Sequence, residues 1–123
     1  MGLDQYATAR KGKAFTNEDG LIDYPDKKEL SYWRKHPNLQ GFMENLWRSK
    51  GNDGEFNCVD VELTLDDLDA LEVAIDKEEL PETRGFFFGE GSDDHYLEQD
   101  RDFILAARNS IGWGYTVVYS SWW

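Results

Sequence analysis

Residues 56–75 read FNCVDVELTLDDLDALEVAI, and this stretch decides the fold because its hydrophobic period changes within it. In the first eight residues, apolar and polar side chains largely alternate. That predicts a strand with one solvated face and a slip of phase at Cys58. From Thr64 onward, apolar positions recur every three or four residues, which predicts an amphipathic helix. Thr64 and Asp67 have the spacing of an N-terminal capping box.

The flanking segments supply the other elements. Pro25 stands where the first turn of a helix accepts proline, and Leu30 and Trp33 follow with helical spacing. The sequence predicts strands at 3–10 and 115–120, a hairpin loop at 11–20, a short strand or buried loop at 85–89, and helices at 26–35, 39–50 and 93–111. These elements follow no strict βαβ period. We therefore expect an α+β fold, in which a small, mainly antiparallel sheet carries about four helices. The length of 123 residues fits a single domain, 1–123.

Composition excludes several classes of protein. Cys58 is the only cysteine, so an internal disulfide is impossible, and with two histidines a standard structural zinc site is excluded. We expect Cys58 to be a small core residue on a strand. The acidic cluster Glu90, Asp93, Asp94, His95 and Glu98 is typical of a helix N-terminus, so we expect no metal and no cofactor. No apolar run is long enough to span a membrane, and we expect a cytoplasmic protein.

Charge is distributed unevenly along the chain. The net charge is −12, but residues 1–50 hold nine Lys/Arg and seven Asp/Glu, whereas residues 51–123 hold four and eighteen. Such an acidic chain is not expected to bind nucleic acid directly. The candidate acidic partner surface consists of Asp60, Glu62, Asp66, Asp67, Asp69, Glu72 and Asp76. It is either an ordinary solvated face or a negative surface that meets a basic partner, with mimicry of nucleic-acid phosphate as the sharper version.

A second group of candidates combines cations with aromatic rings. Its members are Trp33, Arg34, Lys35, His36, Arg84 and Phe87. Arginine and histidine beside aromatic rings can clasp an anion such as phosphate. The alternative interpretation is structural, with a helix end at 32–36 and a core strand at 85–89. No nucleophile can be placed beside His36 or His95 from the sequence, so no catalytic residue is assigned.

Four motifs then indicate a family. They are MGLDQY at 1–6, YWRKHPNLQGF at 32–42, LPETRGFFFG at 80–89 and YSSW at 119–122. Together they resemble a functionally uncharacterised family of short proteins encoded by bacteriophages, marine cyanophages among them, and by some bacteria. Members often have His and Trp where Gln40 and Phe42 stand here, so a role for that His does not carry over. Some are labelled phosphoglycerate kinase, but such an enzyme needs two domains, and this chain has no P-loop.

The resemblance and the charge pattern lead to one main expectation and two alternatives. The main expectation is a phage accessory protein, a non-catalytic acidic binding module that acts on a host macromolecule in the host cytoplasm. The first alternative is a small-ligand or enzymatic domain with an anion pocket near Arg34, His36 and Arg84. The second is a self-associating structural protein, a homodimer that pairs through the C-terminal strand with Trp122 and Trp123.

Overall fold

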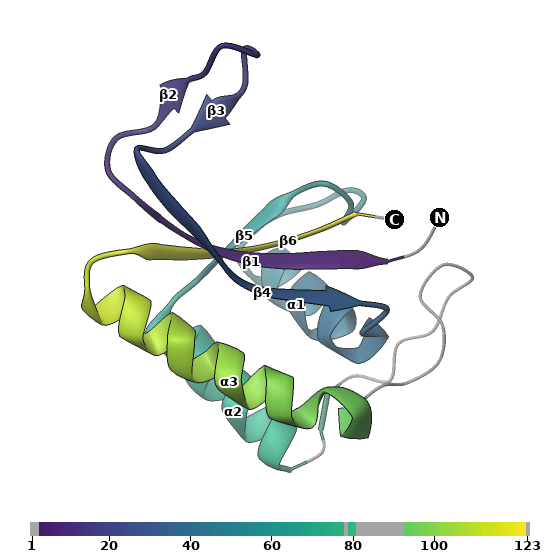
Figure 1. Cartoon of the computed structure of the whole chain (residues 1–123). Coiled ribbons are helices and arrows are strands. Elements are labelled where there is room, and N and C mark those ends of the chain that lie inside the picture. The colour runs from purple at the N-terminus through teal and green to yellow at the C-terminus, as the bar shows by residue number, and fades with distance from the viewer. Residues whose placement is uncertain (1–2, 78, 81–92, 123) are drawn as a thin grey trace.

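The computed structural model describes residues 3–77, 79–80 and 93–122, and within them it has an α+β fold (Figure 1). The main sheet is antiparallel, in the order β4-β1-β6-β5. Its strands are β4 (Asp26–Arg34), β1 (Asp4–Lys11), β6 (Thr116–Trp122) and β5 (Asp60–Leu63). A second sheet, the hairpin of β2 (Phe15–Thr16) and β3 (Ile22–Asp23), projects from the β1–β4 end.

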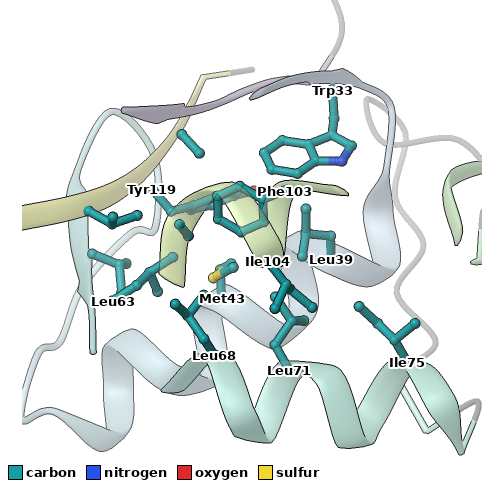
Figure 2. Close-up of a cluster of buried hydrophobic side chains, with 14 of the residues drawn as sticks. Trp33, Leu39, Met43, Leu63, Leu68, Leu71, Ile75, Phe103, Ile104 and Tyr119 are labelled. Atoms are coloured by element: carbon teal, nitrogen blue, oxygen red, sulfur yellow. The ribbon is translucent and has the colours of Figure 1, made fainter. Parts of the chain in front are cut away.

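Three helices cover one face of the main sheet: α1 (Pro37–Ser49), α2 (Leu65–Asp76) and α3 (Asp93–Gly112). Strand alternation sends Gln5, Ala7 and Ala9 of β1 towards the helices. Because Ala7 and Ala9 are small, large rings from neighbouring elements fit beneath the centre of the sheet. The core gathers there, and Figure 2 shows Trp33, Leu39, Met43, Leu63, Leu68, Leu71, Ile75, Phe103, Ile104 and Tyr119 within it.

Among the residues that the structure describes, Trp33 is the largest fully buried side chain, and it lies in this core. Its ring meets Phe103 of α3 edge-on, with centroids 5.0 Å apart and planes at 82°, an arrangement that aromatic quadrupoles favour. Tyr119 of β6 lies on another side, 6.3 Å away. Burying an aromatic of this size stabilises the fold by about 1.5–3 kcal/mol. The contact of Trp33 with Phe103 therefore joins the sheet to α3.

The predicted helix at 26–35 is wrong, because this segment forms strand β4 and pairs with β1 along its length. The register shifts between Ala7 and Thr8 and leaves Leu30 as an extra residue. The bulge lets Leu30 pack against the core on the same side as Trp33. Leu30 and Trp33 therefore both face the core three residues apart, a spacing that is also typical of a helix. The described residues accordingly contain three α-helices, not four.

Pro25 starts no helix, because it lies in a bend directly before β4. Gly12, at the end of β1, has φ of +94°, and a Cβ there would lie 2.7 Å from Pro25 Cγ. Only glycine fits both the backbone angle and the contact. The chain therefore leaves β1 for the projecting hairpin and returns to β4 at the point where Gly12 and Pro25 lie in close contact.

The predictions for α1, α2, α3, β1 and β6 are confirmed. The strand predicted from Phe56 is correct only for Asp60–Leu63. Cys58 is not a core residue, since it is exposed and has φ of 57°, a left-handed conformation that breaks the strand where the sequence pattern slips phase. The predicted strand or loop at 85–89 lies outside the described residues.

The capping box at the start of α2 is confirmed. The Thr64 hydroxyl accepts from Asp67 N–H at 3.2 Å, and Asp67 Oδ2 accepts from Thr64 N–H at 2.9 Å. We expect Thr64→Ala to lower the free energy of unfolding by about 0.5–2 kcal/mol, because a helix donor loses its acceptor. Urea unfolding measures this, with Thr16→Ala on the exposed hairpin as control. Equal stability of the two variants would contradict the role of the cap.

Asp67 also makes stability depend on acid. Burial raises the pKa of Asp67, but hydrogen bonds from Thr64 and Lys50 outweigh burial and hold it below the ordinary value. The resulting stability is present above the unfolded-state pKa of about 3.9 and is lost as pH falls through the lower folded-state pKa. We expect Asp67→Asn to flatten the fall of stability below about pH 4. Unfolding measured across this range checks it, with Glu18→Gln on the exposed hairpin as the control.

Candidate functional site

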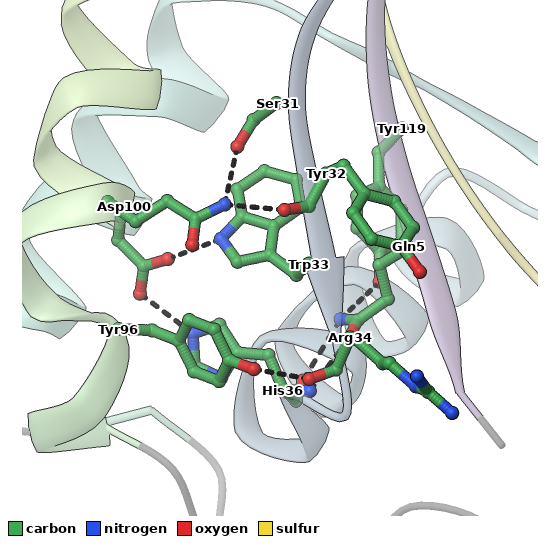
Figure 3. A network of polar contacts seen from close by, with 10 residues as sticks. Gln5, Ser31, Tyr32, Trp33, Arg34, His36, Tyr96, Asp100 and Tyr119 are labelled. Atoms are coloured by element: carbon green, nitrogen blue, oxygen red, sulfur yellow. Dashed lines mark hydrogen bonds and ion pairs between the residues drawn. The ribbon is translucent and has the colours of Figure 1, made fainter.

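A buried polar cluster lies where the end of β4 and the start of α1 meet α3 (Figure 3). His36 Nε2 lies 2.8 Å from Asp100 Oδ2, and Trp33 Nε1–H donates to Asp100 Oδ1 at 2.9 Å. His36 is fully buried and Asp100 is 1% exposed. One carboxylate from α3 thus contacts polar atoms of Trp33 at the end of β4 and of His36 at the start of α1. A buried carboxylate is tolerated only with such partners.

Gln5 of β1 holds the backbone of the same connection. Its Oε1 accepts from His36 N–H at 2.8 Å, and its Nε2 donates to the His36 carbonyl at 3.0 Å and to the Tyr119 hydroxyl at 2.9 Å. The Tyr119 hydroxyl donates in turn to Gln40 Oε1 at 2.5 Å. Burial raises the pKa of Tyr119 strongly, so this hydroxyl stays protonated. Gln40 Nε2 is buried with no hydrogen-bond partner in the described part of the chain.

Side chains of α3 also cover the outer edge of β4. Gln99 Nε2 donates to the Tyr32 carbonyl at 2.6 Å and to Ser31 Oγ at 2.9 Å, and the Tyr96 hydroxyl donates to the Arg34 carbonyl. The Tyr96 ring stacks on His36 with centroids 4.5 Å apart. Burial, and then the charge of Asp100, raises the pKa of Tyr96. These bonds occupy edge carbonyls that could otherwise pair with another strand.

The cluster has the arrangement of a structural site. A general acid or base must come within hydrogen-bond reach of its substrate, directly or through one water. Neither His36 nor Asp100 presents more than 1% of its surface to solvent. A His–Asp contact of this kind therefore fixes the β4–α1 connection against α3. The described residues contain no group of three His, Cys, Asp or Glu side chains placed to hold a metal ion.

The cation–aromatic candidates are only partly brought together. Trp33 and His36 meet at Asp100, but Arg34 and Lys35 are exposed, and the Arg34 side chain extends away from the cluster (Figure 3). Successive strand residues face opposite sides, so Trp33 and Arg34 must separate. Arg84 and Phe87 lie outside the described residues. Among the described members of the set, Arg34 and His36 do not share a pocket.

Sequence reasoning missed Gln5, Gln40, Tyr96, Asp100 and Tyr119 as members of this cluster. A signal existed for Asp100, which follows Tyr96 by four residues and precedes Phe103 by three, a spacing that puts all three on one helix face. Gln5 shows a similar signal, since it shares its strand face with Ala7 and Ala9.

The predicted acidic surface lies on β5 and α2 and is interleaved with cations. Arg10 pairs with Asp60 at 3.1 Å, Lys50 with Asp67 at 2.9 Å and Arg101 with Asp76 at 3.0 Å. Arg108 of α3 bridges two carboxylates of α2, Asp69 at 2.6 Å and Glu72 at 2.9 Å. Glu62 and Asp66 are exposed and form no ion pair with any described residue. Seven carboxylates face four cations here, so the surface stays negative without being a continuous row of free charge.

An open groove of about 410 Å³ lies between α1 and α2. It is lined by Phe42, Asn45, Leu46, Ser49, Ala70, Val73, Ala74 and Glu79. The apolar stripe of α1 therefore divides: Leu39, Met43 and Trp47 enter the core, whereas Phe42 and Leu46 are half-buried beside the groove. Its lining is mainly apolar, with polar side chains from Asn45, Ser49 and Glu79.

Comparison of the chain with protein-family models, curated proteins and solved structures gives no match. None of the described helices combines the length and apolar character needed to cross a bilayer.

The structural role of Asp100 predicts different effects of two substitutions. We expect Asp100→Leu to lower the free energy of unfolding by about 3–5 kcal/mol, because Trp33 and His36 lose a buried polar partner. Asp100→Asn keeps the shape and an acceptor oxygen, and a smaller loss is expected. Urea unfolding followed by tryptophan fluorescence measures both. Equal losses would show that the polar contacts contribute little beyond shape.

Proposed function

We propose that this protein is a non-catalytic acidic binding module that engages a positively charged protein of a host cell. The observation that carries the proposal is the outward negative surface of β5 and α2, next to an open apolar groove. Charge of one sign favours encounter with a partner of the other sign, and adjacent apolar surface supplies affinity. The host setting rests on the resemblance of the sequence motifs to phage proteins.

The pairing of the carboxylates favours a protein partner over mimicry of DNA. A DNA mimic needs a regular array of uncompensated negative charges. Here Arg10, Lys50, Arg101 and Arg108 interrupt such an array. Isolated carboxylates such as Glu62 and Asp66 suit individual Lys or Arg side chains of a protein surface.

The alternative of an anion pocket near Arg34, His36 and Arg84 is not favoured. His36 is engaged in the interior by Asp100 and Tyr96, while Arg34 points elsewhere. The homodimer alternative has one supporting feature, since Trp122 is 59% exposed on the uncovered face of the sheet, but no described residue indicates what covers it.

Removal of two carboxylates that pair with no described cation tests the proposal without disturbing the observed ion pairs. The variant Glu62→Gln/Asp66→Asn and the control Glu18→Gln/Asp19→Asn on the hairpin each lose two exposed charges. Each protein is immobilised and exposed to lysate of a bacterial host at about 0.1 M and about 0.5 M salt. We expect wild type and control to retain a shared cationic protein at low salt, and the Glu62/Asp66 variant to retain much less. Equal retention by all three proteins at both salt concentrations would contradict the proposal.

A further inference from the structure

The groove between α1 and α2 has rows of residues that suit an incoming helix. On α1, Phe42 and Leu46 are four residues apart, and on α2 Ala70 and Ala74 have the same spacing. Residues four apart form a ridge along a helix, and side chains of a second helix fit between such ridges. The small Ala70 and Ala74 allow a close approach. Val73, which is 50% exposed, offers apolar surface that no described residue covers fully.

One end of the groove is held by an ion pair. Lys50 directly follows α1, and its Nζ lies 2.9 Å from Asp67 Oδ2 in the first turn of α2. That carboxylate also belongs to the capping box, so the start of α2 is fixed to the end of α1. A surface formed in advance saves ordering entropy when a partner binds.

The charges around the groove select the partner. Glu79 lines the groove, and Asp66 precedes Ala70 by one helical turn; both are exposed and form no ion pair with a described residue. Lys77, which follows α2, is exposed, while Arg48 and Lys50 at the end of α1 are engaged by Glu44 and Asp67. With the net charge of −12, the local excess of carboxylates disfavours an acidic peptide, an anionic membrane and a second copy of this chain.

We propose that the α1–α2 groove binds an amphipathic helix whose apolar face is flanked by Lys or Arg. This inference rests on the proposed function and specifies where the partner docks and what its docking segment is like. Apolar side chains of that helix contact Phe42, Leu46 and Val73, and its cations pair with Asp66 and Glu79. Recognition is then of the helix-in-groove kind, with anchors spaced at i, i+3 or i+4, and i+7.

A synthetic helix of about 15 residues with a leucine face and lysine flanks is a direct probe. Its binding is compared with that of a scrambled peptide of equal composition and of a leucine–glutamate helix, by fluorescence anisotropy. Ala70→Tyr fills the groove without changing charge, and exposed Ala14→Tyr on the arm leading to the hairpin is the matched control. We expect Ala70→Tyr to weaken binding at least about tenfold and Ala14→Tyr to leave it unchanged.

Several results would overturn the inference, and they separate it from the proposed function. If Ala70→Tyr binds the lysine helix as tightly as wild type, while Glu62→Gln/Asp66→Asn binds it less tightly, the groove is refuted and the acidic module stands. If the scrambled peptide binds equally well, the attraction is charge alone and the groove is again refuted. Light scattering that shows a dimer of wild type and a monomer of Ala70→Tyr would assign the groove to self-association instead.

Discussion

The contact of the Asp100 carboxylate with Trp33 and His36 is the interaction on which the rest of the structure depends. It joins α3 to the end of β4 and the start of α1, which follow each other in the chain but lie 64 or more residues before Asp100. Removing the Asp100 carboxylate and the His36 ring from water costs free energy unless each has hydrogen-bond partners. Few arrangements of these elements other than the observed one provide those partners. Gln5 extends the same constraint to β1, the central strand that pairs with both β4 and β6.

This constraint also places the surfaces of the molecule. With α3 fixed by Asp100 and stacked beside the edge of β4, α2 packs along α3, and Arg108 connects the two helices through Asp69 and Glu72. The carboxylates of α2 then face solvent, and α1 leaves an open groove next to them. The His36–Asp100 pair is enclosed, while the carboxylates of α2 and the apolar groove lie outside. That separation supports the proposal of a binding module.

Much of the fold could be predicted from the sequence, because most elements bury one face in a regular pattern. The helices α1 and α2 and the capping box follow directly from residue spacing. Strand β4 could not be predicted in this way, because the bulge at Leu30 puts Leu30 and Trp33 on one side with helical spacing. Only pairing with β1 decides that segment, and pairing is a long-range contact that local pattern does not contain. The prediction that Cys58 is a core strand residue was wrong for a related reason, because its left-handed backbone interrupts the alternation of the strand.

The candidate sites divide in the same way. The acidic surface could be predicted from the sequence. Its ion pairs depend on tertiary structure, because their cations Arg10, Lys50, Arg101 and Arg108 come from other elements. Trp33 and His36 could be named as candidate site residues from the sequence, whereas their partner Asp100 comes from a helix far along the chain. The groove was not predicted, because it needs two helices that are separated by β5.

Hydrogen exchange of the tryptophan indole N–H groups, followed by NMR, tests most directly whether the Asp100 cluster is sealed. If Asp100 holds the Trp33 indole in the interior, that N–H exchanges only through global unfolding, and its protection matches the stability measured with urea. The indoles of Trp113 and Trp122, which are 65% and 59% exposed, exchange rapidly in the same sample. A Trp33 indole that exchanges as fast as these two would show that the cluster opens to water, and would contradict a purely structural role.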